Sequence, residues 1–488
     1  MNLYLIGHDY RYAAEQMLLT LFPDERPEYP DGRPTGDRAE LRLMSGTKVT
    51  TVTCVLVYHG QTANGRTSVP NGELTDPAEK DRRLQGAVKR AFYRAAMGIG
   101  LPHRPWGMLT GVRPGKLMTP LLAQGLNDAQ AARQFERQYD VSPARADLVV
   151  RTAHATLRAM ESLGEKDVCL YVGIPFCPTR CAYCSFVSQS VEKSMALVPE
   201  FLQALAREIA ATAEAVRRAG LRVVSLYIGG GTPTTLSARQ LDALCTQLEA
   251  AFDLSALREF TVEAGRPDTI TADKLQVLRA HRVDRISVNP QTLDDRVLDT
   301  IGRRHTAQDI YDALRLVRET GGFAVNMDLI AGLPGDTPDG FRATLEQVLA
   351  LAPENVTVHT LSRKRGSNLM AQDAPIPDGA AVGEMLDFAG TVLPRAGYAP
   401  YYLYRQKFMS GGFENVGWTR PGQENLYNIC IMEELCSILA MGGGASTKLV
   451  RPNGGRLERH IDPKYPTEYI ANIDRICAAK AELEAFFQ

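Results

Sequence analysis

From residue 168 onward, short apolar segments alternate with longer segments in which apolar residues recur at helical spacing. Short apolar runs are typical of buried strands, and a period of three to four residues is typical of helices packed on a sheet. The pattern predicts six strands, at 168–174, 223–228, 259–262, 285–288, 324–330 and 356–360. It predicts helices between them at 197–218, 237–252, 271–280, 307–319 and 339–351.

Six β/α units in sequence predict a parallel sheet, because parallel strands need long crossover connections that are usually helical. Six units are too few for a complete eightfold barrel. We therefore expect an α/β fold built on a partial (β/α)6 TIM-like barrel, with its chemistry at the carboxyl ends of the strands. The predicted extent of this core is residues 166–375.

The region before the barrel, residues 1–165, has a different pattern. It predicts an α+β region of unknown role, since β-branched runs are typical of strands and amphipathic stretches of helices. Asn64-Gly65 is a turn signal behind the second strand. The elements expected here are strands at 3–6 and 48–58 and helical stretches at 12–21, 79–97 and 127–163.

The region after the barrel, residues 376–488, is predicted to be mostly helical and to cover the substrate. Tyrosines gather near residue 400, and a Gly-Gly-Gly sequence at 442–444 interrupts the chain. Helices are expected at 380–394, 429–440 and 467–487.

Bulk composition points to a soluble cytoplasmic protein. The net charge is −1, which offers no global attraction to nucleic acid or to an anionic membrane. The N-terminus shows no signal-peptide pattern, and no apolar run is long enough to span a membrane. The nine cysteines are odd in number and mostly scattered, which fits a reducing compartment better than a disulfide framework.

Chemically distinctive residues follow the predicted strands one by one. Cys177 follows the first strand and a Gly-Gly-Gly-Thr sequence at 229–232 follows the second. Glu263, Gln291 and Asp328 occur at the ends of the next three strands. Because these strand ends meet at one edge of the sheet, the pattern predicts a single site at the barrel mouth.

Cys177, Cys181 and Cys184 have the spacing C-x3-C-x2-C. A [4Fe–4S] cluster normally takes four thiolates, so three cysteines leave one iron open for a ligand that reacts. The alternative is a zinc site, but zinc usually takes four ligands in paired spacings, and no second pair lies nearby in the sequence.

This cysteine motif resembles that of the radical S-adenosylmethionine (SAM) superfamily. The wider pattern is similar to the oxygen-independent coproporphyrinogen III oxidase family, in the motifs at 171–177, 229–234, 302–305 and 328–335. The run at 401–434 resembles the HemZ-like branch of that family, and LTGVRPGK at 109–116 shows a weaker resemblance to it.

The resemblance implies two cofactors, a [4Fe–4S] cluster on the three cysteines and SAM. It implies that SAM is bound by residues in the positions that match the family's motifs. These are Tyr171, Tyr183, Gly229, Gly230, Gly231, Thr232, Glu263, Gln291, Arg303 and Asp328.

The reaction that the resemblance implies is oxidative decarboxylation of two propionates of coproporphyrinogen III to vinyl groups, giving protoporphyrinogen IX in heme biosynthesis. A 5′-deoxyadenosyl radical would remove hydrogen from the propionate β-carbon, and a flavodoxin or ferredoxin would supply electrons. Because the substrate is a tetra-anion, it needs local cations and aromatic surface. The residues hypothesised to contact it are Arg363, Arg365, Tyr402 and Arg405.

Two positions depart from the well-characterised branch of the family. Phe186 stands where that branch has a further cysteine, and Gly173 where it has histidine. Phe186 is more similar to the heme-chaperone and HemZ-like branches. Two alternatives therefore stay open: a heme-binding chaperone on the same fold, and another radical reaction on a tetrapyrrole, either methyl transfer or ring opening, that uses two SAM molecules.

Overall fold

A computed structural model describes residues 1–179, 181–184, 189–190, 194–362, 375–406, 410–451 and 457–487. The chain forms two compact units. The first comprises Met1–Val112 and Gly125–Leu148, and the second comprises Arg113–Gln124 and Val149–Gln488. No helix among the described residues combines the length and the apolar character needed to cross a membrane.

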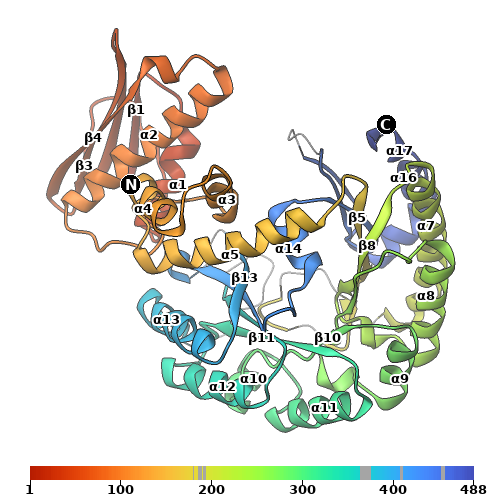
Figure 1. Cartoon of the computed structure of the whole chain (residues 1–488). Helices are drawn as coiled ribbons and strands as arrows, with labels where there is room; N and C mark the ends of the chain where they lie inside the picture. The colour runs from red at the N-terminus through yellow and green to blue at the C-terminus, as the bar shows by residue number, and fades with distance from the viewer. Residues whose placement is uncertain are drawn as a thin grey trace. The chain divides into compact units, whose positions relative to one another are not determined.

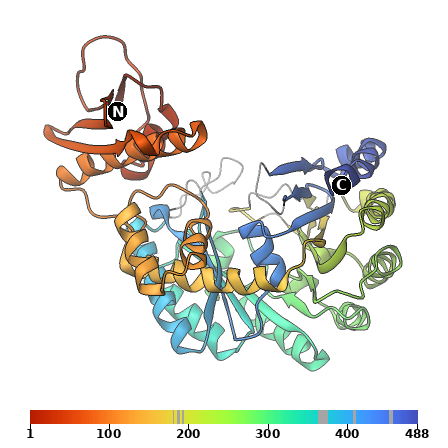
Figure 2. The ribbon, with the colours of Figure 1, turned by 45° about the horizontal axis from the view of Figure 1, so that its top comes forward.

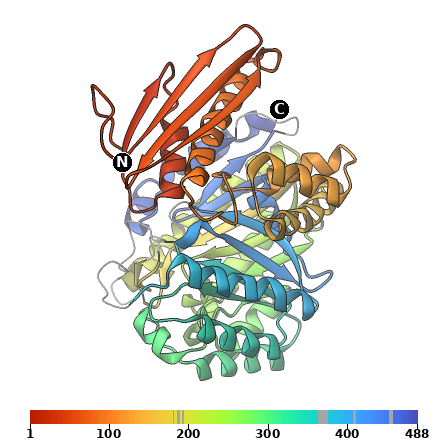
Figure 3. The same ribbon diagram turned by 90° about the vertical axis from the view of Figure 1, so that its left-hand side faces the viewer.

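The first unit is a four-stranded sheet with helices packed against one face (Figure 3). The strand order follows the sequence, β1-β2-β3-β4, with β1 parallel to β2 and the other pairs antiparallel. Its core is formed by the apolar faces of α1, α2 and the sheet. The elements are β1 (Asn2–Ile6), α1 (Arg11–Leu21), β2 (Arg38–Ser45), β3 (Val49–Tyr58), β4 (Gln61–Pro70), α2 (Pro77–Gly98) and α4 (Asp128–Tyr139).

The turn expected at Asn64-Gly65 is wrong, because both residues lie inside β4. The hairpin turns instead at His59-Gly60, where both residues have positive φ angles of 48° and 78°. Two consecutive positive φ angles are what a tight two-residue hairpin turn requires. Gly65 serves packing, since a Cβ there would overlap the backbone carbonyl of Ala91 on α2.

The second unit is built on an eleven-stranded sheet curved into an incomplete barrel, with helices along its outer side (Figures 1 and 2). The strand order is β13-β14-β12-β11-β10-β9-β8-β5-β15-β16-β17. The six strands from β5 to β12 are parallel neighbours, which confirms the predicted partial (β/α)6 barrel. They are β5 (Asp167–Ile174), β8 (Arg222–Gly230), β9 (Glu259–Val262), β10 (Arg285–Ser287), β11 (Ala324–Ala331) and β12 (Asn355–Thr360).

Five helices of the barrel also lie where the apolar periodicity predicts them, and a short sixth helix at Asp295–Thr300 was not predicted. Side-chain caps fix several of their starts, for example Ser237 before α8 and Thr306 before α11. The helices are α7 (Val198–Arg218), α8 (Ala238–Ala251), α9 (Ala272–Ala280), α10 (Asp295–Thr300), α11 (Ala307–Thr320) and α12 (Pro338–Ala350). Two further helices, α3 (Gly115–Ala123) and α5 (Pro143–Ser162), precede the barrel in the sequence.

The C-terminal region adds strands to both edges of this sheet. β13 (Ala399–Arg405) and β14 (Glu414–Thr419) extend it antiparallel beyond β12. β15 (Ser437–Gly442) lies parallel to β5, and β16 (Ser446–Leu449) and β17 (Glu458–Ile461) follow it. The helices of this region are α13 (Gly379–Arg395), α14 (Leu426–Glu433), α15 (Pro466–Ala471), α16 (Ile473–Ala481) and α17 (Glu484–Phe487).

The helix expected at 429–440 is wrong in its second half. α14 ends where Glu434 adopts a left-handed conformation with φ of 55°, and the chain turns into β15. Every residue of β15 is buried between β5 and β16, so tertiary pairing overrides the helical pattern of this apolar run.

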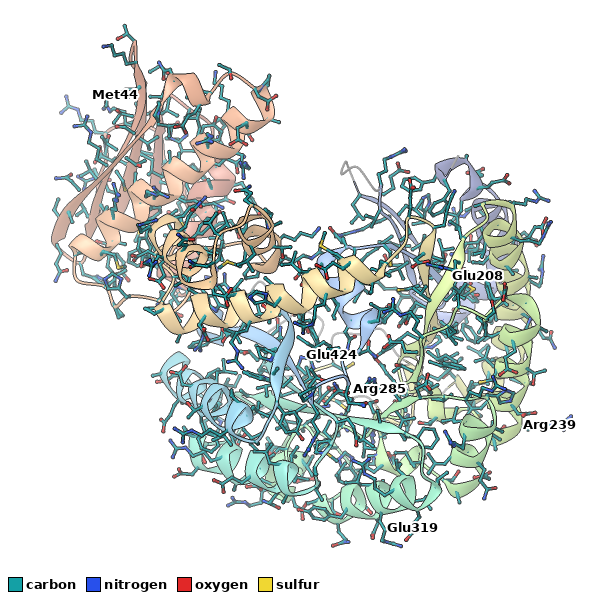
Figure 4. All side chains as sticks on the ribbon, in the orientation of Figure 1. Met44, Glu208, Arg239, Arg285, Glu319 and Glu424 are labelled. Carbon is teal, nitrogen blue, oxygen red and sulfur yellow. The ribbon has the colours of Figure 1, made fainter. Side chains whose placement is uncertain are left out.

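α14 lies at the amino-terminal ends of the barrel strands. Its first turn is capped by Glu259 at the start of β9, whose carboxylate accepts hydrogen bonds from the backbone of Leu426 (2.8 Å) and Tyr427 (2.7 Å). Arg285 of β10, labelled beside Glu424 in Figure 4, donates to the Gln423 carbonyl at 3.0 Å. These bonds hold α14 against the interior of the barrel, opposite the mouth at which the strands end.

Candidate functional site at the barrel mouth

The three motif cysteines lie on the segment that follows β5, and all three are partly buried. Polar groups from neighbouring loops donate to their sulfurs: Thr232 Oγ1 lies 3.5 Å from Cys177 Sγ, and Arg266 Nη1 lies 3.5 Å from Cys181 Sγ. Donors aimed at sulfur stabilise thiolates, which are the form that binds iron. The donor set therefore fits an iron–sulfur cluster with one iron not bound by the motif.

The cysteine segment is tied to the turn that carries Arg303. The backbone N–H of Ala182 donates to the Ile301 carbonyl (3.0 Å), and Arg303 donates to the Tyr183 hydroxyl (2.9 Å) and the Asn289 carbonyl (3.2 Å). Burial opposes the charge of Arg303, but the neighbouring Tyr183 and Cys181 raise the pKa of its guanidinium. Arg303 is 8% exposed, so it lies inside the site and orients Tyr183.

Three glycines at the end of β8, Gly229 to Gly231, allow the backbone to pass close to the cluster loop. A Cβ on Gly231 would stand 2.5 Å from the Phe176 carbonyl oxygen and 3.0 Å from Cys177 Sγ. Gly230 has a φ of 110°, a conformation that side chains disfavour. A Cβ on Gly229 would stand 3.0 Å from the Glu263 carboxyl carbon. Side chains at Gly231 and Gly229 would therefore collide with the cysteine segment and with Glu263, respectively.

Glu263 follows β9 and accepts a hydrogen bond from the Tyr227 hydroxyl at 2.6 Å. Burial raises the pKa of its carboxyl to about 7. Behind it, the rings of Tyr171, Tyr227 and Tyr427 stack with centroids 4.4–6.1 Å apart. A carboxyl that titrates near neutrality and is backed by aromatic rings can accept hydrogen bonds from hydroxyl or ammonium groups of a bound cofactor.

Gln291 follows β10 with a φ of 67° and bridges to β11 through its backbone, its N–H donating to the Asp328 carbonyl at 2.9 Å. Its side-chain oxygen Oε1 is buried and has no hydrogen-bond partner among the described residues. Such an acceptor is costly unless a ligand satisfies it. This orphaned oxygen therefore fits a bound cofactor at the same place.

Asp328 is held by amide donors, Asn289 Nδ2 at 2.7 Å and Asn326 Nδ2 at 2.8 Å. His359 of β12 lies 3.8 Å away. Burial opposes ionisation of Asp328, but the hydrogen bonds and the His359 ring lower the pKa of its carboxyl. Asp328 is thus held as an anion, whereas Glu263 titrates near neutral pH.

The three cysteines and eight of the ten residues expected to bind SAM lie at or next to the carboxyl ends of the barrel strands, whereas Tyr171 and Asp328 lie three residues before the ends of β5 and β11. Sequence reasoning missed Arg266 and Asn289 and gave His359 no role. The available signals were weak: Arg266 is three residues after Glu263, and Asn289 two before Gln291. Their roles depend on contacts between different loops.

Of the four residues expected to contact substrate, the structure describes two. Arg363 and Arg365 lie outside the described residues. Tyr402 is buried, and its ring packs over Gly417 of the adjacent β14. Arg405 is also buried and donates to the Gly412 carbonyl at 2.6 Å. Both side chains are thus buried, and their contact with substrate stays a prediction.

Residues 171–348 match the sequence model of the Radical SAM superfamily. The oxygen-independent coproporphyrinogen-III oxidase-like protein HemZ of Bacillus subtilis is 39% identical over 389 residues, which is 78% of each chain. The heme chaperone HemW of Lactococcus lactis is 29% identical over 66% of this chain and 80% of its own.

Among solved structures, coproporphyrinogen III oxidase (HemN) of Escherichia coli, described as a radical SAM enzyme, is similar with a TM-score of 0.51. The identity is 25%, over 66% of this chain and 72% of the other. The shared part supports the same barrel architecture.

Proposed function

Because this chain belongs to the radical SAM superfamily and, within it, to the oxygen-independent coproporphyrinogen-III oxidase-like family, we propose that it oxidatively decarboxylates coproporphyrinogen III to protoporphyrinogen IX. Its cofactors are those of the superfamily, a [4Fe–4S] cluster and SAM. The two propionates that become vinyl groups would each lose carbon dioxide, one hydrogen atom and one electron.

The observation that carries this proposal is the similarity to the Bacillus subtilis protein, which extends well beyond the superfamily motif on both sides. The geometry of the mouth also supports the proposal. Three thiols, two of which accept hydrogen bonds on sulfur, an orphaned amide oxygen and two carboxyls of different pKa are suited to holding a cluster and SAM.

The cofactor pair supplies the radical that removes hydrogen from the substrate. The chain's residues would position the groups around it. Thr232 and Arg266 stabilise the thiolates, and Glu263, Gln291 and Asp328 would accept hydrogen bonds from SAM. The Tyr171–Tyr227–Tyr427 stack would close the barrel interior behind bound SAM and help to exclude water, which would protect a reactive radical from side reactions.

The proposal is tested with protein reconstituted anaerobically with iron and sulfide, reduced, and mixed with SAM and coproporphyrinogen III. Mass spectrometry follows 5′-deoxyadenosine and the porphyrin together. Loss of two carboxyl groups, matched to cofactor cleavage, is the expected result. A methylated or ring-opened product would contradict decarboxylation and would favour the other radical reaction considered above.

A second candidate is a heme-binding chaperone. It is favoured by the similarity to HemW over 80% of that protein and by Phe186, where the well-characterised oxidase branch has a cysteine. Heme titration of the same preparation separates the two. Tight, stoichiometric heme binding without substrate-dependent 5′-deoxyadenosine would favour the chaperone.

A further inference from the structure

A second group of three cysteines lies inside the barrel, away from the motif. Cys169, Cys430 and Cys436 have Sγ atoms that all lie within 4.8 Å of one another, and the Cys169 and Cys436 sulfurs are 3.6 Å apart. All three are more than nine-tenths buried. They are the one such group of three metal-ligating side chains found among the described residues.

Three different elements bring these thiols together. Cys169 lies on β5 two residues before Tyr171, so both side chains leave the strand on the same face. Cys430 lies on α14, three residues after Tyr427, and Cys436 immediately precedes β15. The group therefore lies behind the tyrosine stack, and the stack separates it from Glu263 at the mouth.

The spacing suits one ion. With metal–sulfur bonds of about 2.3 Å, three thiolates in a plane around one ion stand about 4.0 Å apart. The Cys169–Cys436 pair lies slightly below that value and no pair is more than 4.8 Å apart, so an ion needs only small side-chain adjustments. A disulfide would require the nearest pair to close to about 2.05 Å.

The number and surroundings of the thiols indicate the kind of ion. Thiolates select soft metals such as Cu(I) and zinc, and zinc in structural sites almost always takes four protein ligands. Among the described residues the group offers three, within a cluster of apolar and aromatic side chains.

We propose that Cys169, Cys430 and Cys436 bind a single soft metal ion of the Cu(I) type, with three sulfur ligands. The competing explanation is three cysteines acting as small apolar core residues. That explanation requires burial alone and does not require sulfurs from two distant parts of the chain to converge around one point.

The test uses the full chain with Cys177, Cys181 and Cys184 replaced by alanine, so that the mouth cannot take copper. Anaerobic titration with Cu(I) against a chromogenic copper chelator should give one tightly bound ion per chain. X-ray absorption of the copper-loaded protein should show three sulfur neighbours. Adding Cys430→Ala should weaken the affinity at least 100-fold, and adding Cys245→Ser, a buried cysteine on α8, should leave it unchanged.

Two-sulfur or nitrogen–oxygen coordination would overturn the proposal, as would undiminished affinity after Cys430→Ala. Recovery of Cys169 and Cys436 as a disulfide from protein that binds no copper would also overturn it, in favour of a redox pair. The absorption measurement needs no second-site variant, so it decides the question even if Cys430→Ala does not fold. Copper loading should also raise the Tm of the triple-alanine chain.

Discussion

The barrel contains two groups of three cysteines, one at the mouth and one in the interior. The two groups differ in sequence spacing, exposure and surroundings. At the mouth, the thiols are close in sequence, partly exposed, and surrounded by charged and polar groups from neighbouring loops. Inside the barrel, the thiols come from residues 169, 430 and 436 and are buried among apolar and aromatic side chains. The mouth suits chemistry on an exchangeable ligand, whereas the interior suits a permanently held ion.

The largest difference is expected from Cys181→Ala compared with Cys436→Ala. Loss of one of three protein ligands should abolish the cluster at the mouth and reduce SAM cleavage by at least about 10³-fold. Cys436→Ala should retain the iron and most of the cleavage. Iron and sulfide content with 5′-deoxyadenosine formation measures both, and equal losses in the two variants would remove the distinction between the sites.

Gly231→Ala should come next. Its Cβ would stand 2.5 Å from the Phe176 carbonyl oxygen and 3.0 Å from Cys177 Sγ, so the cluster loop must move. We expect about a 10²-fold loss of SAM cleavage, since displacement of a reacting group by about 1 Å has that order of effect. The matched control is Gly390→Ala on α13, where a Cβ meets nothing within 4 Å. An active Gly231→Ala enzyme with an unchanged cluster spectrum would contradict the close packing.

Glu263→Gln tests the electrostatics of the mouth. The carboxyl has a folded-state pKa of about 7, above the ordinary value of 4.5, so the folded state binds the proton more tightly than the unfolded state. The free energy of unfolding should therefore fall as pH rises from 4.5 to 7, by about 3 kcal/mol relative to the glutamine variant. Urea unfolding of both proteins across this range measures the difference. A constant difference would mean that Glu263 titrates normally.

The smallest effect is expected from Arg266→Gln. The guanidinium donates to Cys181 Sγ, and hydrogen bonds to charged groups contribute about 1.5–3 kcal/mol. Its loss should lower the reduction potential of the cluster and slow SAM cleavage about tenfold without loss of iron. Arg239→Gln is the control, because Arg239, labelled in Figure 4, is exposed on the surface. An unchanged potential would mean that Arg266 is only structural.

The barrel could be predicted from the sequence because each β/α unit carries its own apolar pattern. Most of the predicted strands agree with the structure to within one or two residues, as in β9 (Glu259–Val262). The failures are places where distant contacts decide. The sequence of β15 predicts a continuation of the preceding helix, but this segment pairs with β5 instead. Gly65 has the sequence signal of a turn, but it lies in a strand against which α2 packs.

The site divides in the same way. The cysteine motif and the residues that follow each strand are local signals, so they could be identified before the fold was known. Arg266, Asn289 and the interior cysteines act through contacts between segments far apart in sequence. Cys169 and Cys436 are 267 residues apart and meet only because β15 lies beside β5.

The central claim is that the mouth generates a radical that acts on a propionate side chain. It is tested most directly with coproporphyrinogen III that carries deuterium on the propionate β-carbons. The account predicts deuterium in the 5′-deoxyadenosine, one atom for each carboxyl group lost. Unlabelled 5′-deoxyadenosine, with the deuterated propionates intact, would contradict the assignment of the substrate.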